Sequence, residues 1–175
     1  MSFKSAKLSD FLIVDLYKNA LINNISSELT KNTSPNKEQI INKLEFLGEN
    51  KKNIVIVVED KEAVFISDEK LQLLTNLLQA CNLSLADVAI INIANKNLNY
   101  TTLKNGIPFE FLLMMGINFK QFELPLVFSK NKVQQFNNAH LLITENLDDL
   151  LRDTAEIKTQ KRALWNALKM MFNIK

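Results

Sequence analysis

Two adjacent carboxylates, Glu59 and Asp60, directly follow an unbroken run of β-branched residues at 54–58. Such a run predicts a strand that is covered on both faces of a parallel sheet. Open α/β sheets place their ligands at the carboxyl ends of their strands. The pair could therefore hold a metal ion or act as general acid and base. Because the two residues are neighbours in sequence, solvated loop charges are the more ordinary interpretation.

Other residues that could do chemistry are few and scattered. A phosphate-binding loop needs glycines so that backbone amides can approach the anion, and residues 59–63 contain none. The only histidine, His140, stands at the start of a predicted strand, away from the carboxyl ends, and is interpreted as a structural or surface residue. The only cysteine, Cys81, follows a leucine-rich helix and is expected to be a buried thiol. We therefore expect no catalytic residue, no metal site and no cofactor.

The composition is typical of one soluble domain. The chain has 175 residues, of which 47% are hydrophobic and 23% charged, a balance found in globular proteins. A single cysteine rules out an internal disulfide, and the apolar runs are shorter than the ~20 residues that a membrane-spanning helix needs. These features favour a cytoplasmic protein without a membrane partner.

Charge is weakly basic overall and unevenly distributed near the end of the chain. The formal net charge is +2. This charge is too small to predict nucleic-acid binding from the electrostatic field of the protein as a whole. Acidic residues gather at 145–156 and basic ones at 158–175. This order complements a helix macrodipole, and it also leaves open a basic surface for nucleic acid.

Strands and helices alternate along most of the chain. Strands are predicted at four places: 53–58, 87–94, 111–116 and 139–144. A helix that Ser67 can cap extends to about Asn82, and the last helix is expected over 153–172, with a capping-box-like start at Asp153 and Glu156. A small hairpin is expected within 124–138. This alternation predicts a three-layer α/β/α domain with a four-stranded, mainly parallel sheet.

A separate helical arm is expected at the start of the chain. Apolar residues recur at three-to-four spacing there, which places them on one helix face; the docking candidates among them are Leu8, Phe11, Leu12 and Tyr17. A polar linker follows, so residues 1–36 are predicted to form the arm and residues 37–175 the α/β domain. A short helix from Lys37 to Leu47, ending at Gly48, would open that domain. Such an amphipathic arm is either part of the core or a device for docking on a partner.

Three stretches resemble the uracil-DNA glycosylase superfamily: 65–92, 112–116 and 143–169. In the first, Asn82-Leu83-Ser84-Leu85-Ala86-Asp87-Val88 is similar to the family's "Gly-Leu-x-x-x-Asp-Val". In the last, Lys161-Arg162-Ala163-Leu164-Trp165-Asn166-Ala167-Leu168-Lys169 is similar to "Lys-Arg-x-x-Trp-x-x-Leu-Lys". The resemblance implies the superfamily's α/β fold.

The same resemblance implies that a glycosylase pocket has degenerated. The family's glycine-rich loop, which positions the attacking water and the flipped base, corresponds here to the segment with Glu59 and Asp60. The family's base-reading asparagine matches Asn92. Its loop histidine, which stabilises the departing uracil, corresponds to Asn146. Catalysis is therefore not expected.

Among the members of this superfamily, the chain resembles the psi-type subunits of the bacterial DNA polymerase III clamp-loader complex, which have lost catalysis. That resemblance implies a role in DNA replication, with an N-terminal peptide that docks on clamp-loader subunits. It also implies a globular part that binds a chi-like subunit, giving an indirect link to single-stranded DNA through single-strand-binding protein.

Two other functions stay open at this point. One is a divergent uracil-DNA glycosylase that uses Asn92 for recognition and Glu59 or Asp60 to activate water. The other is a non-catalytic DNA-binding module that uses the basic last helix. The partner's identity and the oligomeric state do not follow from the sequence.

Overall fold

The computed structural model describes residues 44–94, 96, 98–118, 120, 122–124 and 129–174. The predicted arm with Leu8, Phe11, Leu12 and Tyr17, and its boundary at residue 36, lie outside the described residues. Most of the helix predicted from Lys37 lies outside them too.

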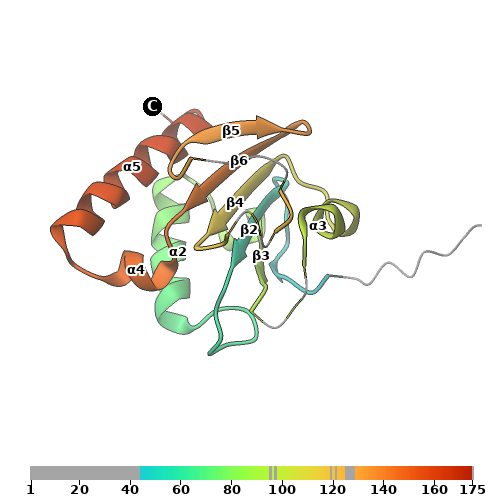
Figure 1. Ribbon diagram of the computed structural model, residues 1–175, viewed down its shortest axis with the longest axis horizontal. Helices are drawn as coiled ribbons and strands as arrows, with labels where there is room; N and C mark the ends of the chain where they lie inside the picture. The colour runs from blue at the N-terminus through green and yellow to red at the C-terminus, as the bar shows by residue number, and fades with distance from the viewer. Residues whose placement is uncertain are drawn as a thin grey trace, which may run out of the picture. The chain divides into compact units, whose positions relative to one another are not determined.

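A six-stranded mixed sheet forms the centre of the domain (Figure 1). Its strand order is β1-β3-β2-β4-β6-β5. The strands are β1 (Leu47–Gly48), β2 (Ile54–Val58), β3 (Val88–Asn92), β4 (Phe111–Met115), β5 (Val133–Phe136) and β6 (Ala139–Thr144). The four central strands, β3, β2, β4 and β6, are parallel, whereas β1 and β5 pair antiparallel at the two edges. The domain is thus α/β as expected, but its sheet is mixed and has six strands.

Helices cover both faces of this sheet. The element α2 (Asp68–Ala80) packs on the same face as α5 (Ala155–Met171), together with the short α4 (Leu147–Leu151). The opposite face is covered by α3 (Tyr100–Gly106) and the loops around it (Figure 1). A 3₁₀ turn, η1 (Leu85–Asp87), leads into β3. Because every residue of β2 and β3 is buried, their side chains are apolar on both faces with one exception, Asn92.

Alternating side chains of the strands divide the interior into two cores. On β2, Ile54, Ile56 and Val58 face the helices α2 and α5, whereas Val55 and Val57 face the side of α3. This is the period of two that a pleated strand imposes. The sheet therefore lies between the two cores, and both cores hold its strands in place.

Residues Leu47 and Gly48 form a strand, so the prediction that a helix ends there is wrong. They pair with Ile90 and Ala89 of β3. Gly48 has a φ of +106°, and a Cβ at this position would collide with the carbonyl oxygen of Val88. Glycine is thus required by the close approach of the two backbones, and it marks an edge strand rather than a helix end.

The hairpin near the end of the sheet differs from the expected one. Residues 125–128, its predicted first arm, lie outside the described residues. The second arm is the strand β5, and it pairs with β6 through a turn at Asn137 and Asn138. Both asparagines have positive φ values, 47° and 61°, as a tight two-residue hairpin turn requires.

Two helix starts also differ in detail from the prediction. Ser67 occupies the N-cap position of α2, but its side chain makes no capping hydrogen bond. Thr154, not Asp153, caps α5, and its hydroxyl oxygen accepts from the backbone N–H of Ile157 at 3.3 Å. In both cases the helix begins within two residues of the expected place.

Adjacent leucines of α2 provide a test of this packing. Leu74 is fully buried beneath the sheet, at 0% exposure, whereas Leu73 is half-buried. Leu74→Ala should lower the free energy of unfolding by about 3 kcal/mol, because it leaves a cavity in the core. The matched Leu73→Ala should cost about 1 kcal/mol or less. Urea denaturation measures both values, and equal losses would contradict the described orientation of α2.

Candidate functional site

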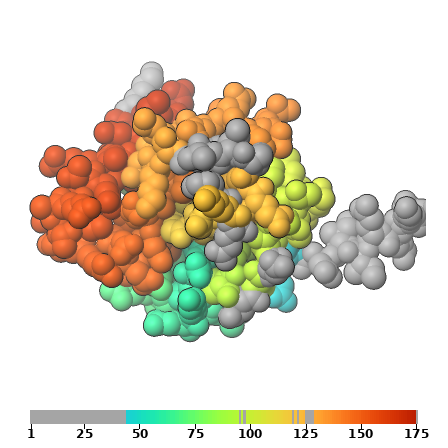
Figure 2. Space-filling view, viewed as in Figure 1, coloured from blue at the N-terminus to red at the C-terminus, as the bar shows by residue number. Residues whose placement is uncertain are grey.

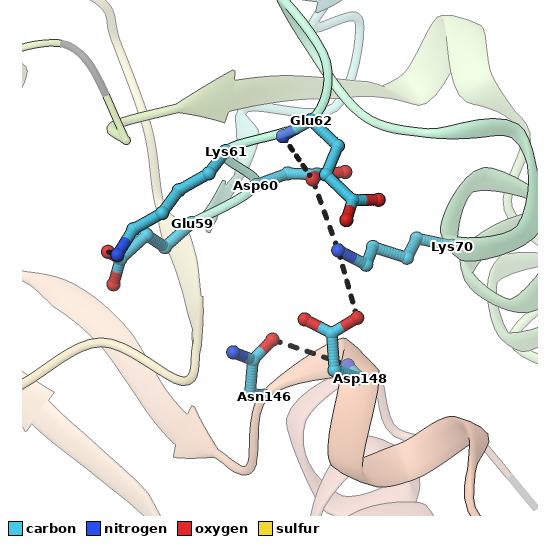
Figure 3. A pocket seen from close by; sticks show the side chains of 7 residues that line it. All are labelled: Glu59, Asp60, Lys61, Glu62, Lys70, Asn146 and Asp148. Atoms are coloured by element: carbon cyan, nitrogen blue, oxygen red, sulfur yellow. Dashed lines mark hydrogen bonds and ion pairs between the residues drawn. The ribbon is translucent and has the colours of Figure 1, made fainter.

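The chain changes direction across the sheet at β2. It passes from β2 to β3 on one side and later to β4 on the other, and open sheets bind ligands outside the carboxyl ends of the strands at such a point. A pocket of about 430 Å³ lies there (Figure 3). Its lining residues are Glu59, Asp60, Lys61, Glu62, Lys70, Asn146 and Asp148. In Figure 2 the blue-green segment after β2 lies beside the red-orange segment that contains α4.

Asp60 is buried at the base of this pocket, with 1% of its surface exposed. Its carboxylate accepts hydrogen bonds from the backbone N–H of Ser67 at 2.8 Å and of Glu62 at 3.1 Å, and from Lys70 Nζ at 3.1 Å. Burial by itself raises the pKa of this carboxyl, but these donors outweigh burial and lower the pKa to about 2. The interpretation of Asp60 as a solvated loop charge is therefore wrong.

Lys70 joins two parts of the chain that are far apart in sequence. Its side chain is 8% exposed, and Nζ lies 3.1 Å from Asp60 and 2.9 Å from Asp148 Oδ1 at the start of α4 (Figure 3). Burial acts to lower the pKa of Lys70, and the two carboxylates raise it above its usual value. The ammonium group is therefore a fixed positive charge that ties α2 to the loop after β2 and to α4.

Lys70 was not predicted as a site residue from the sequence, although a signal for it was present. Lys70 lies one turn before Leu74, which itself lies one turn before Leu78, so the three residues share the buried face of α2. A lysine in the first turn is also opposed by the helix dipole. A cation at a core position and at the unfavourable helix end predicts a nearby carboxylate partner.

Asn92 ends β3 and is buried, with 4% exposure. Its Oδ1 accepts from the backbone N–H of Asp60 at 3.0 Å and of Ala94 at 3.1 Å. Its Nδ2 donates to the carbonyl oxygens of Asp60 at 2.7 Å and of Ala63 at 2.8 Å. The side-chain amide is thus engaged by the backbone of the loop that follows β2, and it clamps that loop to the neighbouring strand.

Glu59 and Asn146 stand on opposite sides of the pocket (Figure 3). Glu59 is partly exposed, and its carboxylate lies 3.9 Å from Lys61 Nζ. Asn146 caps α4, where its Oδ1 accepts from the backbone N–H of Asp148 at 3.3 Å. Gly116, with a φ of +72°, approaches Asn146 so closely that a Cβ would lie 2.7 Å from the Cβ of Asn146. The structure therefore gathers Glu59, Asp60 and Asn146 around one pocket, with Asn92 holding its wall.

The charges of the pocket limit its chemistry. Four carboxylates, those of Glu59, Asp60, Glu62 and Asp148, surround two lysine ammonium groups. Such an environment repels phosphate groups. Among the described residues, no group of three or more His, Cys, Asp or Glu side chains is placed to bind a metal ion.

The remaining candidates lie elsewhere in the domain. His140 is exposed near the start of β6 and stacks on Phe111, with ring centroids 5.4 Å apart. Cys81 is buried at the end of α2, and burial raises the pKa of its thiol. Both placements confirm the sequence-based interpretation. Within the described residues, no helix combines the length and the apolar character needed to cross a membrane.

No protein-family model matches this sequence, and no curated protein matches it significantly.

The low pKa of Asp60 predicts a pH-dependent contribution to stability. A carboxyl whose pKa falls from 3.8 in the unfolded chain to about 2 in the folded one stabilises the fold by about 2 kcal/mol above pH 4. This contribution is lost as the pH falls from about 4 to about 2, and roughly half of it remains at pH 3. Asp60→Asn should remove it, so urea denaturation should show a loss at pH 7 that shrinks towards pH 3.

The neighbouring substitution Glu62→Gln is the control, because it removes an exposed carboxyl and leaves the backbone N–H that Asp60 uses. It should keep the pH dependence of the unmodified chain. A stability of Asp60→Asn equal to that of the unmodified protein at pH 7 would show that the buried carboxylate does not stabilise the fold.

Proposed function

We propose that this chain is a non-catalytic, protein-binding subunit of the psi type in a bacterial DNA polymerase III clamp-loader assembly. Its α/β domain is proposed to have the uracil-DNA glycosylase-like fold with a catalytically inactive pocket. On this proposal it works in the cytoplasm during DNA replication and contacts DNA only through other proteins.

The observation that carries the proposal is the engagement of Asp60 and Asn92 by the chain itself. A base-reading asparagine must offer its amide to the base, but all five hydrogen bonds of the Asn92 side chain go to backbone groups at 60, 63, 64 and 94. A general base must reach water, but the Asp60 carboxylate already accepts hydrogen bonds from Lys70 and from two backbone amides. Exposing either group would break several buried hydrogen bonds, each costly to lose.

The arrangement of the sheet supports the proposed glycosylase-like fold. Its four parallel strands are those that the glycosylase-like interpretation requires, and helices lie on both faces. The strands β1 and β5 are additions at the edges. The motif residues Leu164 and Leu168 belong to the buried face of α5, where they support the same sheet.

Glu59 is the other carboxylate that the glycosylase alternative would use to activate a water molecule. It has partial exposure and only a long contact to Lys61. With Asn146 in place of a histidine, the pocket offers an amide where a departing uracil anion would need a stronger donor. This arrangement favours binding over glycosidic bond cleavage.

The partner test uses the full chain in its native cell. Tagged protein should co-purify with clamp-loader subunits and a chi-like subunit, because the apolar face predicted from the sequence for residues 8–21 would supply the leucine and aromatic area that such contacts need. Replacing Phe11 and Leu12 by serine should abolish recovery of the clamp-loader subunits. The matched substitutions Asp15→Ser and Asn19→Ser, in the same segment, should leave recovery unchanged.

Two results would contradict the proposal. The first is equal recovery of clamp-loader subunits with tagged and untagged chains. The second is release of uracil from uracil-containing DNA by the purified protein, provided that it disappears in Glu59→Gln while the circular dichroism spectrum stays unchanged.

A further inference from the structure

An apolar groove lies between α2, α4 and α5, apart from the pocket at the strand ends. It has a volume of about 270 Å³, and its lining residues are Leu73, Asn76, Leu77, Leu150, Lys161, Leu164, Trp165 and Leu168. Six of these eight residues are apolar. A concave, mainly apolar surface between helices is a common place for a ligand or a partner helix.

One wall of the groove is formed by leucines of α2 that do not face the sheet. Leu74 and Leu78 face the sheet and are buried, whereas Leu73 and Leu77 form a second row that is only half-buried. Trp165 of α5 lies across from that row and is also half-buried. Half-buried tryptophan and leucine side chains around a depression are typical anchors of a protein interface.

The charge at the groove is positive on the side of α5. Lys161 is the only charged residue that lines the groove. Arg162 follows it on the exposed surface, and α5 as a whole has four basic residues and one acidic residue. Lys158 is paired with Asp153 at 3.1 Å, whereas among the described residues no carboxylate lies within ion-pair distance of Lys161.

We infer that the α2–α5 groove binds an amphipathic helix of a partner protein, with leucine-like side chains on its apolar face and carboxylates beside them. The apolar side chains would lie against Leu73, Leu77 and Trp165, and a carboxylate would reach Lys161. Such a helix matches both the apolar groove and the charge of Lys161, which has no ion-pair partner in the described part of the chain, whereas an uncharged or a basic amphipathic helix matches only the apolar groove. This inference deepens the proposed function, on which it rests, by naming a binding surface on the α/β domain.

Trp165 makes the inference directly measurable, since it is the only tryptophan in the chain. Three tryptophan-free probe peptides of about 18 residues are long enough to form a helix. One has a leucine face flanked by glutamate, the second has lysine in place of each glutamate, and the third has serine in place of each leucine. Adding the acidic peptide to the full chain should shift Trp165 emission to shorter wavelength.

The dissociation constant of the acidic peptide should be about tenfold lower than that of the basic peptide, and the serine peptide should not bind. Lys161→Glu should reverse the preference between the two charged peptides. Lys132→Glu makes the same charge change at an exposed position outside the groove, and it should leave both binding constants unchanged.

Equal binding of the acidic and basic peptides, or no change of Trp165 emission at millimolar peptide, would overturn the inference. So would a concentration-dependent emission shift without peptide that accompanies a dimer in sedimentation, because a second copy would then occupy the groove. These measurements use the purified chain alone. Their failure is therefore distinguishable from failure of the co-purification, which tests the clamp-loader role.

Discussion

The buried carboxylate of Asp60 organises one edge of the sheet. It accepts the ammonium group of Lys70 and two backbone amides, while the backbone of Asp60 is clamped by Asn92. Through Lys70 the same cluster reaches Asp148 and therefore α4. Removing Asp60, Lys70 or Asn92 leaves buried polar groups without a partner, which costs more than the intact cluster contributes. The ends of β2 and β3 and the starts of α2 and α4 are held in place by this cluster.

This constraint shapes the position at which open α/β sheets usually bind their ligands. The topology places a crevice at the switch point, as in many enzymes of open α/β architecture. In this chain, the crevice wall is built from groups that bond to one another. The resemblance to a glycosylase framework and the internal engagement of Asp60 and Asn92 support the same proposal, in which the fold is kept and its outer helices bind proteins.

The sequence predicted the parts of the structure that depend on local patterns. Runs of mainly apolar residues predicted the four parallel strands, and apolar stripes at helical spacing predicted α2 and α5, all within a few residues of their bounds. The edge strand β1 was not predicted, because it has two residues and depends on Gly48 fitting against Val88. The burial of Asp60 was not predicted either, because its partners Ser67, Lys70 and Asn92 are brought to it only by tertiary packing. Glu59, Asp60 and Asn146, which the resemblance had grouped, line one pocket because the carboxyl ends of the parallel strands meet at one edge of the sheet.

Asp60 and Lys70 act together to hold this edge of the sheet. A double-mutant cycle measures that coupling directly, with Asp60→Asn, Lys70→Met and the double substitution compared by urea denaturation at pH 7. Each single substitution should destabilise the fold, and the double substitution should cost less than their sum by more than about 1 kcal/mol. Losses that add to within about 0.5 kcal/mol would contradict this coupling, because the two groups would then stabilise the fold independently.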